Sequence, residues 1–203
     1  IYKKDFSQSH MTGRMKPLLL RIRHMARLLI LRHGKTELVS ETGRDFDRKL
    51  VERGKRNCSD MARYIKGHLT IPDVILVSPA VRTIESAEWV MKEWSQQPEY
   101  IIDERIYNAS SDTLFDLIHE HAGDASTVMI IGHNPGMILL CHDLIAEDGN
   151  QAGKDVNDYP TATLADMVFD LDQFKDLERE SGKLLSLIRP RDMVKVDDKG
   201  RLN

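Results

Sequence analysis

Arginine and histidine side chains follow three apolar runs of this 203-residue sequence. Arg32 and His33 come directly after the run at 28–31, Arg82 follows the run at 74–77, and His133 follows the run at 127–131. Guanidinium and imidazole groups that gather without carboxylates form a pocket for a dianion such as phosphate. Neutral histidine is also a nucleophile toward phosphorus, because it divides hydrolysis into two easier displacements. These residue types predict a phosphoryl-transfer site.

The apolar runs are predicted to be strands of one parallel sheet. Residues 28–31 are apolar without alternation, which is typical of a strand buried on both faces between helices. Open α/β sheets bind ligands at the carboxyl ends of their strands, where Arg32 and His33 lie. Gly34 is expected to permit a sharp turn and the close approach of a ligand. An Arg-His pair alone could equally solvate a strand end, so the other two junctions favour the site.

Helix-start signals follow the second and third runs. Ser78 is expected to cap a helix that begins at Pro79 and carries Arg82 in its first turn, close to amides suited to an anion. Asn134 and Pro135 are expected to begin the next helix, at 137–145. Further strands are predicted at 164–169 and 184–188. Further helices are predicted from 54 to a stop at Gly67 and around 114–118. Loops are predicted at 35–47 and 147–159.

Composition is typical of a folded protein, with 41% hydrophobic and 30% charged residues. No stretch approaches the roughly 20 apolar residues of a membrane helix, so we expect no membrane partner. Cys58 and Cys141 both fall on apolar faces of predicted helices, and two lone thiols form neither a disulfide framework nor a zinc site. A reducing compartment is favoured, and we expect a cytoplasmic protein.

Charge divides the sequence into a basic leader and an acidic body. Residues 1–27 carry a net charge of +6 and the remainder carries −9, which argues against nucleic acid as a partner. The leader, residues 1–26, is consistent with a mitochondrial-type presequence or with poorly ordered sequence ahead of a domain, since Met25 offers a later start. We expect one domain at 27–194 and a loose tail at 195–203.

The sequence lacks the usual signals of metal-dependent phosphoryl transfer. There is no Walker-type loop with Lys and Ser and no run of Asp suited to magnesium. His119 and His121 are two positions apart on a predicted helix and would point to opposite sides, which disfavours a shared metal. We expect no metal and no cofactor, with Arg32 and Arg82 supplying the positive charge.

Seven ordered motifs resemble those of the histidine phosphatase superfamily, also called phosphoglycerate mutase-like. Three carry the general signature: Arg32-His33-Gly34, Ser78-Pro79 with Arg82, and Gly132-His133-Asn134-Pro135-Gly136. Four more resemble the short phosphohistidine phosphatase branch, the SixA type: Phe46-Asp47-Arg48, Arg105-Ile106-Tyr107-Asn108-Ala109, Pro160-Thr161 and Arg189-Pro190-Arg191-Asp192. The resemblance covers about residues 27–194 and implies a three-layer αβα sandwich with a mostly parallel central sheet.

The resemblance also implies a role for each site residue. His33 would be the nucleophile that becomes phosphorylated, and Arg32, Arg82 and His133 would bind the phosphoryl oxygens and stabilise the transition state. Arg48 would line the same pocket. Glu104 matches a proton donor of mutase-like members, but it could equally be a surface carboxylate paired with Arg105, and members of the short branch can lack the acid.

The implied activity is that of a metal-independent phosphohydrolase that acts on phosphorylated protein histidine through a phosphohistidine intermediate. The segments after the first strand and between Glu104 and Thr127 are short, so little material is available to enclose a small substrate. A broad small-molecule phosphomonoesterase, or a mutase-like enzyme on sugar or nucleotide phosphates, is the alternative. A catalytically idle phosphate-binding module is a third possibility, disfavoured by the intact motifs. The sequence does not indicate an oligomeric state.

Overall fold

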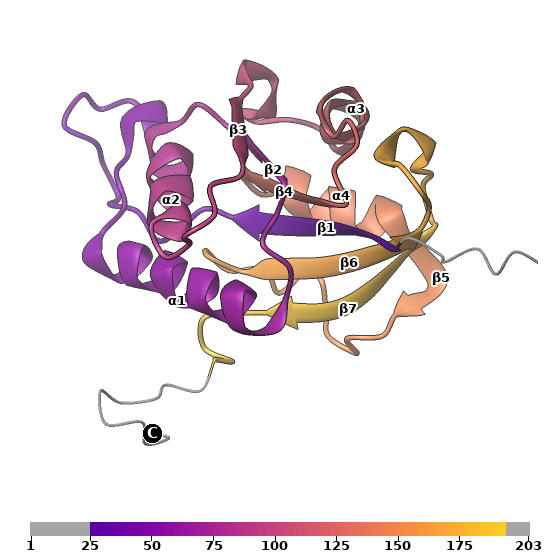
Figure 1. Cartoon of the computed structure of the whole chain (residues 1–203). Coiled ribbons are helices and arrows are strands. Elements are labelled where there is room, and N and C mark those ends of the chain that lie inside the picture. The colour runs from indigo at the N-terminus through magenta and orange to yellow at the C-terminus, as the bar shows by residue number, and fades with distance from the viewer. Residues whose placement is uncertain (1–24, 194–203) are drawn as a thin grey trace, which may run out of the picture.

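A seven-stranded sheet of order β3-β2-β4-β1-β6-β7-β5 forms the middle layer of the protein (Figure 1). The computed structural model describes residues 25–193. The strands are β1 (Met25–Arg32), β2 (Val74–Val77), β3 (Glu99–Ile102), β4 (Thr127–Gly132), β5 (Ile145–Asn150), β6 (Leu164–Asp170) and β7 (Gly182–Ile188). All are parallel except β6, which runs antiparallel to β1 and β7. The prediction of a mostly parallel sheet is confirmed.

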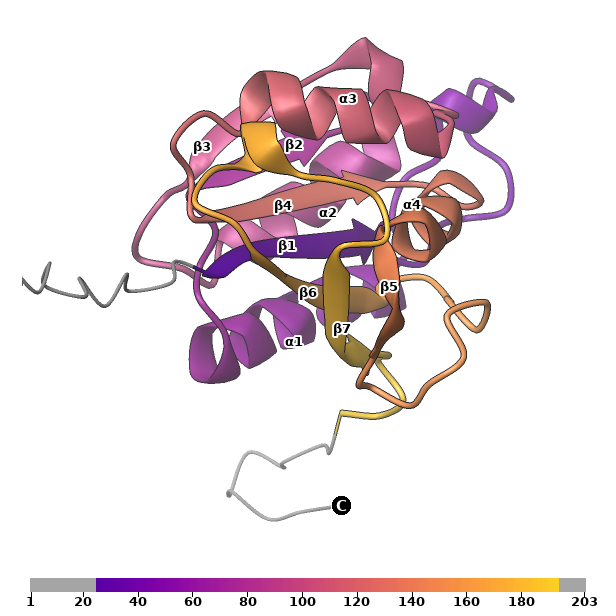
Figure 2. The same ribbon diagram turned by 90° about the vertical axis from the view of Figure 1, so that its right-hand side faces the viewer.

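Two pairs of helices cover the two faces of this sheet (Figures 1 and 2). The helices are α1 (Glu52–His68) and α2 (Val81–Met91) on one face, and α3 (Ser111–His121) and α4 (Gly136–Leu144) on the other. Leu28 and Ile30 of β1 pack into the cluster with α3 and α4, whereas Leu29 and Leu31 pack into the cluster with α1 and α2. The uniformly apolar run therefore fills both cores, as expected for the central strand of an αβα sandwich.

Strand order explains which chain segments meet. Because β2, β4 and β1 are adjacent and parallel, the residues that follow their carboxyl ends lie at one edge of the sheet. Strand β3 is at the border of the sheet, three positions from β1, which corresponds to about 14 Å at the usual spacing of strands. The loop after β3 nevertheless reaches the edge where His33 lies, because Asn108 lines the same pocket as His33, whereas Glu104, at the start of this loop, does not.

Both predicted helix starts are wrong by one or two residues. Helix α2 begins at Val81, and Ser78 makes no cap; helix α4 begins at Gly136, with Pro135 as its N-cap and not Asn134. The side chain of Ser78 bonds to His133 and that of Asn134 donates to the carbonyl of Tyr159, so neither is available to a helix amide. The predicted stop at Gly67 is also displaced, because α1 continues to His68.

One predicted loop contains a strand. Residues 145–150 were expected to end a helix and enter a loop, but they form β5, which pairs in parallel with β7 at the border of the sheet. Polar residues such as Glu147 suit an exposed border strand, which explains why the apolar pattern did not reveal it.

The predicted leader at 1–26 and tail at 195–203 lie outside the described residues, apart from Met25 and Ala26, which belong to β1. Cys58 and Cys141 are buried free thiols on α1 and α4, as predicted. Among residues 25–193, none of the helices has the length and apolar character needed to cross a bilayer.

Candidate active site

A pocket of about 300 Å³ lies at the carboxyl ends of the central strands. It brings together five of the six residues predicted from the sequence, and only Glu104 is not part of it. Its walls are formed by Arg32, His33, Lys35, Thr36, Asp45, Arg48, Arg82, Asn108, His133, Asn134 and Thr161.

His33 is a buried imidazole with one ring nitrogen held by the backbone. It is only 7% exposed, and its Nδ1 lies 2.7 Å from the carbonyl oxygen of Gly34. Because a carbonyl can only accept, Nδ1 carries the proton and the lone pair is on Nε2. Burial, together with the nearby guanidinium of Arg82, lowers the pKa of His33 to about 4 even though the bond to Gly34 opposes the shift. The imidazole is therefore neutral at pH 7.

Two glycines set the backbone around His33. A Cβ on Gly34 would lie 2.9 Å from both the sulfur of Cys58 and the carbonyl oxygen of Gly54. A Cβ on Gly54 would lie 2.1 Å from the carbonyl oxygen of Lys35. Gly34 is thus required for the close packing of α1 against the end of β1.

Backbone carbonyls hold two of the arginines in the pocket. Nη1 of Arg32 donates to the carbonyl of Tyr159 over 2.8 Å, and burial together with the charge of Arg82 lowers the pKa of Arg32. Nε of Arg48 donates to the carbonyl of Glu37 over 2.8 Å. A guanidinium has five N–H donors, so both arginines retain donors for an anion.

His133 lies beside His33, with ring centroids 5.3 Å apart. Its Nε2 is 2.8 Å from Oγ of Ser78, a fully buried hydroxyl. Burial is the main cause that lowers the pKa of His133 to about 3, and the charge of Arg82 adds to it. Within residues 25–193, Nδ1 of His133 and Nε of Arg32 are buried without a hydrogen-bond partner. Unpaired buried nitrogens are costly, so the site is suited to a ligand rich in acceptors.

Asp45 is the carboxylate of this pocket, and it is not among the residues predicted from the sequence. Its Oδ2 accepts from Nη2 of Arg82 (2.9 Å) and from the hydroxyl of Tyr107 (3.1 Å), and its Oδ1 accepts from Nη1 of Arg48 (2.9 Å). The bond from Arg48 is the largest of the causes that lower the pKa of Asp45 to about 2. The sequence feature that could have pointed to this contact is the spacing of three residues between Asp45 and Arg48.

Glu104 lies outside the pocket. It is exposed, in the short 3-10 helix Glu104–Ile106 that follows β3. The alternative pairing of Glu104 with Arg105 is not observed either, because Arg105 forms its ion pairs with Asp103 and Glu120. Asp103 pairs in addition with His121.

Metal ligands do not cluster in the part of the chain that the structure describes: it holds no group of three or more His, Cys, Asp or Glu side chains placed to bind an ion. His119 bonds to the carbonyl of Leu177 and His121 to Asp103, so the two predicted helix histidines point to different partners. Positive charge at the site comes from the guanidinium groups and from Lys35.

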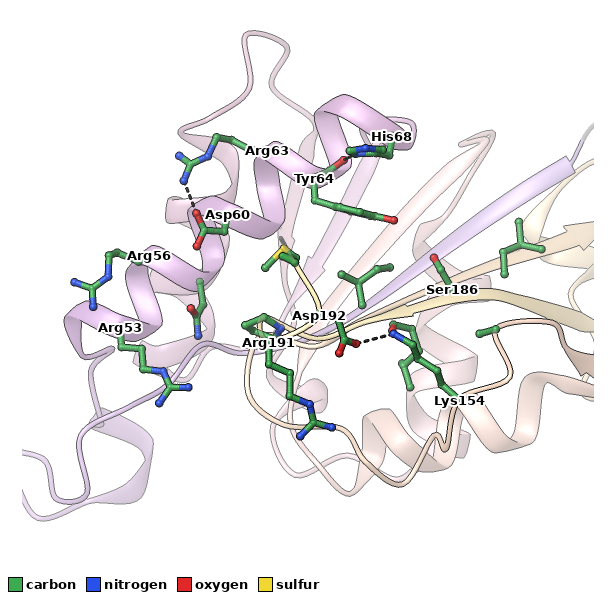
Figure 3. Close-up of a pocket in the computed structure, with 17 residues that line it drawn as sticks. Arg53, Arg56, Asp60, Arg63, Tyr64, His68, Lys154, Ser186, Arg191 and Asp192 are labelled. Carbon is green, nitrogen blue, oxygen red and sulfur yellow. Dashed lines mark hydrogen bonds and ion pairs between the residues drawn. The ribbon is translucent and has the colours of Figure 1, made fainter. Parts of the chain in front are cut away.

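A larger cleft of about 1350 Å³ lies elsewhere, between α1 and β7 (Figure 3). Charged side chains of α1, among them Arg53 and Arg56, form one wall, and the pair Lys154–Asp192 lies on the other. None of the residues that form the small pocket lines this cleft.

Comparisons with known proteins agree with this geometry. Residues 28–126 match the family described as Histidine phosphatase superfamily (branch 1). An uncharacterized protein of Mycobacterium leprae is 25% identical over 149 residues, which cover 72% of this chain and 89% of that protein. An uncharacterized chloroplastic protein of Arabidopsis thaliana is 26% identical over 123 residues, which cover 54% of this chain and 55% of that protein.

Solved structures of SixA proteins share the fold. The SixA protein of Agrobacterium tumefaciens superposes with a TM-score of 0.68 at 27% identity, over 81% of this chain and 98% of that one. The SixA protein of Nakamurella multipartitia gives a TM-score of 0.72 at 22% identity, over 82% and 96%. The motifs, the strand order and these matches agree, and the chain therefore belongs to the histidine phosphatase superfamily as a phosphatase enzyme.

Proposed function

We propose that this protein is a metal-independent phosphohydrolase that removes the phosphoryl group from phosphorylated histidine of proteins. The observation that carries the proposal is the neutral His33, whose Nδ1–H is bound by the carbonyl of Gly34 and whose Nε2 is left free among three guanidinium groups. This arrangement supplies an uncharged nucleophile and a cationic enclosure for the phosphoryl oxygens.

The reaction would proceed in two displacements. Nε2 of His33 attacks phosphorus, the N–P bond to the enzyme forms, and the bond to the leaving group breaks. Water then attacks phospho-His33, the N–P bond breaks, and inorganic phosphate leaves. Arg32, Arg48 and Arg82 would neutralise the charge on the equatorial oxygens in both steps.

His133 would act as a neutral hydrogen-bond donor to the phosphoryl group. If the hydroxyl of Ser78 donates to Nε2 of His133, Nδ1 keeps its proton. That proton has no partner among residues 25–193, so a phosphoryl oxygen would satisfy it. Ser78 would then be a positioning residue that selects the useful tautomer.

Two observations support a phosphohistidine substrate. The protein histidine phosphatase SixA complexed with tungstate, a tetrahedral oxyanion, has the same fold, with a TM-score of 0.67 at 19% identity. Glu104, the predicted acid for poor leaving groups, is outside the pocket, and an imidazole leaving group needs less protonation than an alkoxide. A small-molecule phosphatase is the second candidate, because an alpha-ribazole-5'-P phosphatase of Escherichia coli shares the fold with a TM-score of 0.55.

The test is a comparison of kcat/KM for a phosphohistidine peptide, an alkyl phosphate and an aryl phosphate, each with and without EDTA. We expect the phosphohistidine peptide to be preferred and chelation to leave all three rates unchanged. Strong preference for a sugar phosphate would favour the second candidate. Loss of activity in EDTA, with recovery on addition of magnesium, would contradict the metal-independent mechanism.

A further inference from the structure

Asp45 is the one acidic side chain among the described residues that line the catalytic pocket. It stands at the start of the 3-10 helix Asp45–Asp47, and its backbone carbonyl also accepts from Nη1 of Arg82 over 2.7 Å. Arg82 is therefore held by Asp45 through both the backbone and the carboxylate. Arg48 and Arg82, which are proposed to bind the phosphoryl group, therefore also hold this carboxylate in place.

Aromatic contacts fix the segment that carries Asp45. The ring of Phe46 packs edge-on against the ring of Tyr107, with centroids 5.0 Å apart, and Tyr107 packs edge-on against His133 at 5.5 Å. The hydroxyl of Tyr107 donates to Asp45. The carboxylate is thus tied, through Tyr107, to the wall of the pocket that carries His133.

The Asp45 side chain is nevertheless 54% exposed, whereas that of Arg82 is 6% exposed. Asp45 lies on the solvent side of the pocket and Arg82 on its inner side. A leaving group must depart through the open side of a pocket whose base holds the nucleophile, because in-line displacement places nucleophile and leaving atom on opposite sides of phosphorus. Asp45 is positioned at that side and can exchange protons with solvent.

A phosphoryl dianion and the Asp45 carboxylate would compete for the same guanidinium groups. When the dianion takes donors of Arg48 and Arg82, the carboxylate loses hydrogen bonds that favour its charged form and gains a negative neighbour. Both changes favour the protonated carboxyl. A group that is ionised in the empty pocket would thereby become able to carry a proton once substrate is bound.

On this basis we propose that Asp45, and not Glu104, is the proton-transfer residue of the reaction. The inference rests on the proposed phosphohydrolase function and adds a catalytic residue to it. As His33 attacks phosphorus and the bond to the leaving group breaks, the Asp45 carboxyl gives its proton to the departing atom and becomes a carboxylate. In the second step the attacking water gives a proton to that carboxylate as its oxygen bonds to phosphorus and the bond to His33 breaks.

The experiment compares Asp45→Asn with wild type over phosphate esters whose leaving groups become progressively poorer: 4-nitrophenyl, phenyl and alkyl. Asn keeps the size and can still accept from Arg48, but it cannot transfer a proton. We expect kcat/KM to fall less than 3-fold for 4-nitrophenyl phosphate and about 100-fold or more for phenyl and alkyl phosphates. Asp45→Glu should restore part of the loss with the poor leaving groups.

Asp47→Asn is the matched control, since Asp47 belongs to the same short helix but bonds to Arg44 and Thr42 away from the pocket. Asp47→Asn and Glu104→Gln should keep the wild-type dependence on the leaving group. Equal loss of kcat/KM with all three esters in Asp45→Asn would overturn the inference, because Asp45 would then only hold the arginines. Tighter inhibition by vanadate with an unchanged leaving-group dependence would also overturn it, because Asp45 would then only compete for the pocket.

Rapid quench of wild type with 4-nitrophenyl phosphate tests the proposed phosphohydrolase mechanism independently of the role of Asp45. Phospho-His33 in wild type, with equal loss in Asp45→Asn, would reject only the role of Asp45. The absence of any phosphoenzyme in wild type would reject the proposed mechanism and the role of Asp45 with it.

Discussion

The small pocket at the strand ends and the large cleft beside α1 are both rich in arginine, but they differ in how deeply those arginines are buried. In the pocket, the side chain of Arg82 is 6% exposed and two buried imidazoles are neutral. In the cleft, Arg63 and Arg191 are more than half exposed, each pairs with a nearby aspartate, and water screens them.

The larger of the two cavities is therefore not the one whose side chains suit a reaction. The cleft is more than four times as large as the pocket, but charges in high dielectric stabilise a transition state weakly. Burial in the pocket strengthens the interactions of the arginines and also keeps His33 unprotonated. Convergence and burial, and not cavity size, are the reasons for proposing the small pocket as the active site.

The largest expected effect in this comparison is that of His33→Ala. Removing the nucleophile should lower kcat/KM by at least about 1000-fold while the protein stays folded. Steady-state kinetics on a phosphohistidine peptide and an aryl phosphate measure the loss, with circular dichroism as the check on folding. Wild type should also yield an acid-labile, base-stable phosphoenzyme that His33→Ala lacks. Undiminished turnover by His33→Ala would disprove the mechanism.

Arg82→Ala should come next, with kcat/KM reduced about 100-fold or more, because a buried guanidinium acts in low dielectric on the transferring phosphoryl group. Vanadate inhibition should weaken in parallel, since vanadate resembles the transition state. Arg82→Lys keeps the charge but loses the two-pronged geometry and should recover only part of the activity. If Arg82→Ala kept full vanadate affinity, the assignment of Arg82 to the phosphoryl group would be wrong.

Ser78→Ala tests the tautomer of His133 and should cost about 10-fold in kcat/KM. Without the hydroxyl, Nε2 of His133 loses its observed partner and the ring can hold its proton on either nitrogen. Vanadate affinity should fall by a similar factor, whereas a variant that only loosened the fold would lower the melting temperature with little change in vanadate affinity. Ser78→Thr is the conservative variant that should restore the hydrogen bond.

Acid should destabilise the folded protein through the two pocket histidines. Their pKa values are about 4 for His33 and about 3 for His133, below the usual value near 6.5 of an unfolded chain. Protonation therefore favours the unfolded state, so this stability is complete above pH 6.5 and is lost as the pH falls toward 4. At pH 5 each histidine should cost about 1–2 kcal/mol. Urea unfolding at pH 7 and pH 5 would detect this, and a smaller loss is expected in His33→Ala.

The smallest effect is expected in the large cleft. Arg56 is exposed on α1 and forms no ion pair with other residues in the range 25–193. Arg56→Ala should change kcat/KM for an aryl phosphate by less than 2-fold, in contrast to Arg82→Ala. A comparable loss in the two variants would mean that the cleft takes part in catalysis and that the distinction between the two regions is mistaken.

The sequence by itself determined the central strands and the convergence of four residues in one pocket: Arg32, His33, Arg82 and His133. Apolar runs mark strands because their periodicity is local, and residues that follow parallel strands converge wherever those strands are neighbours. Arg48 was predicted through the resemblance of its motif, and it too lines the pocket.

Only the tertiary structure decided the positions of the acids and of Ser78. Glu104 follows a strand that lies at the border of the sheet, and strand order is not written in any local pattern. Asp45 reaches the pocket because its loop folds back onto Arg82, 37 residues away in the chain. Ser78 has a sequence context that favours a helix cap, but the nearby ring of His133 offers its hydroxyl a buried partner. Contacts between distant segments, and not local propensity, made these choices.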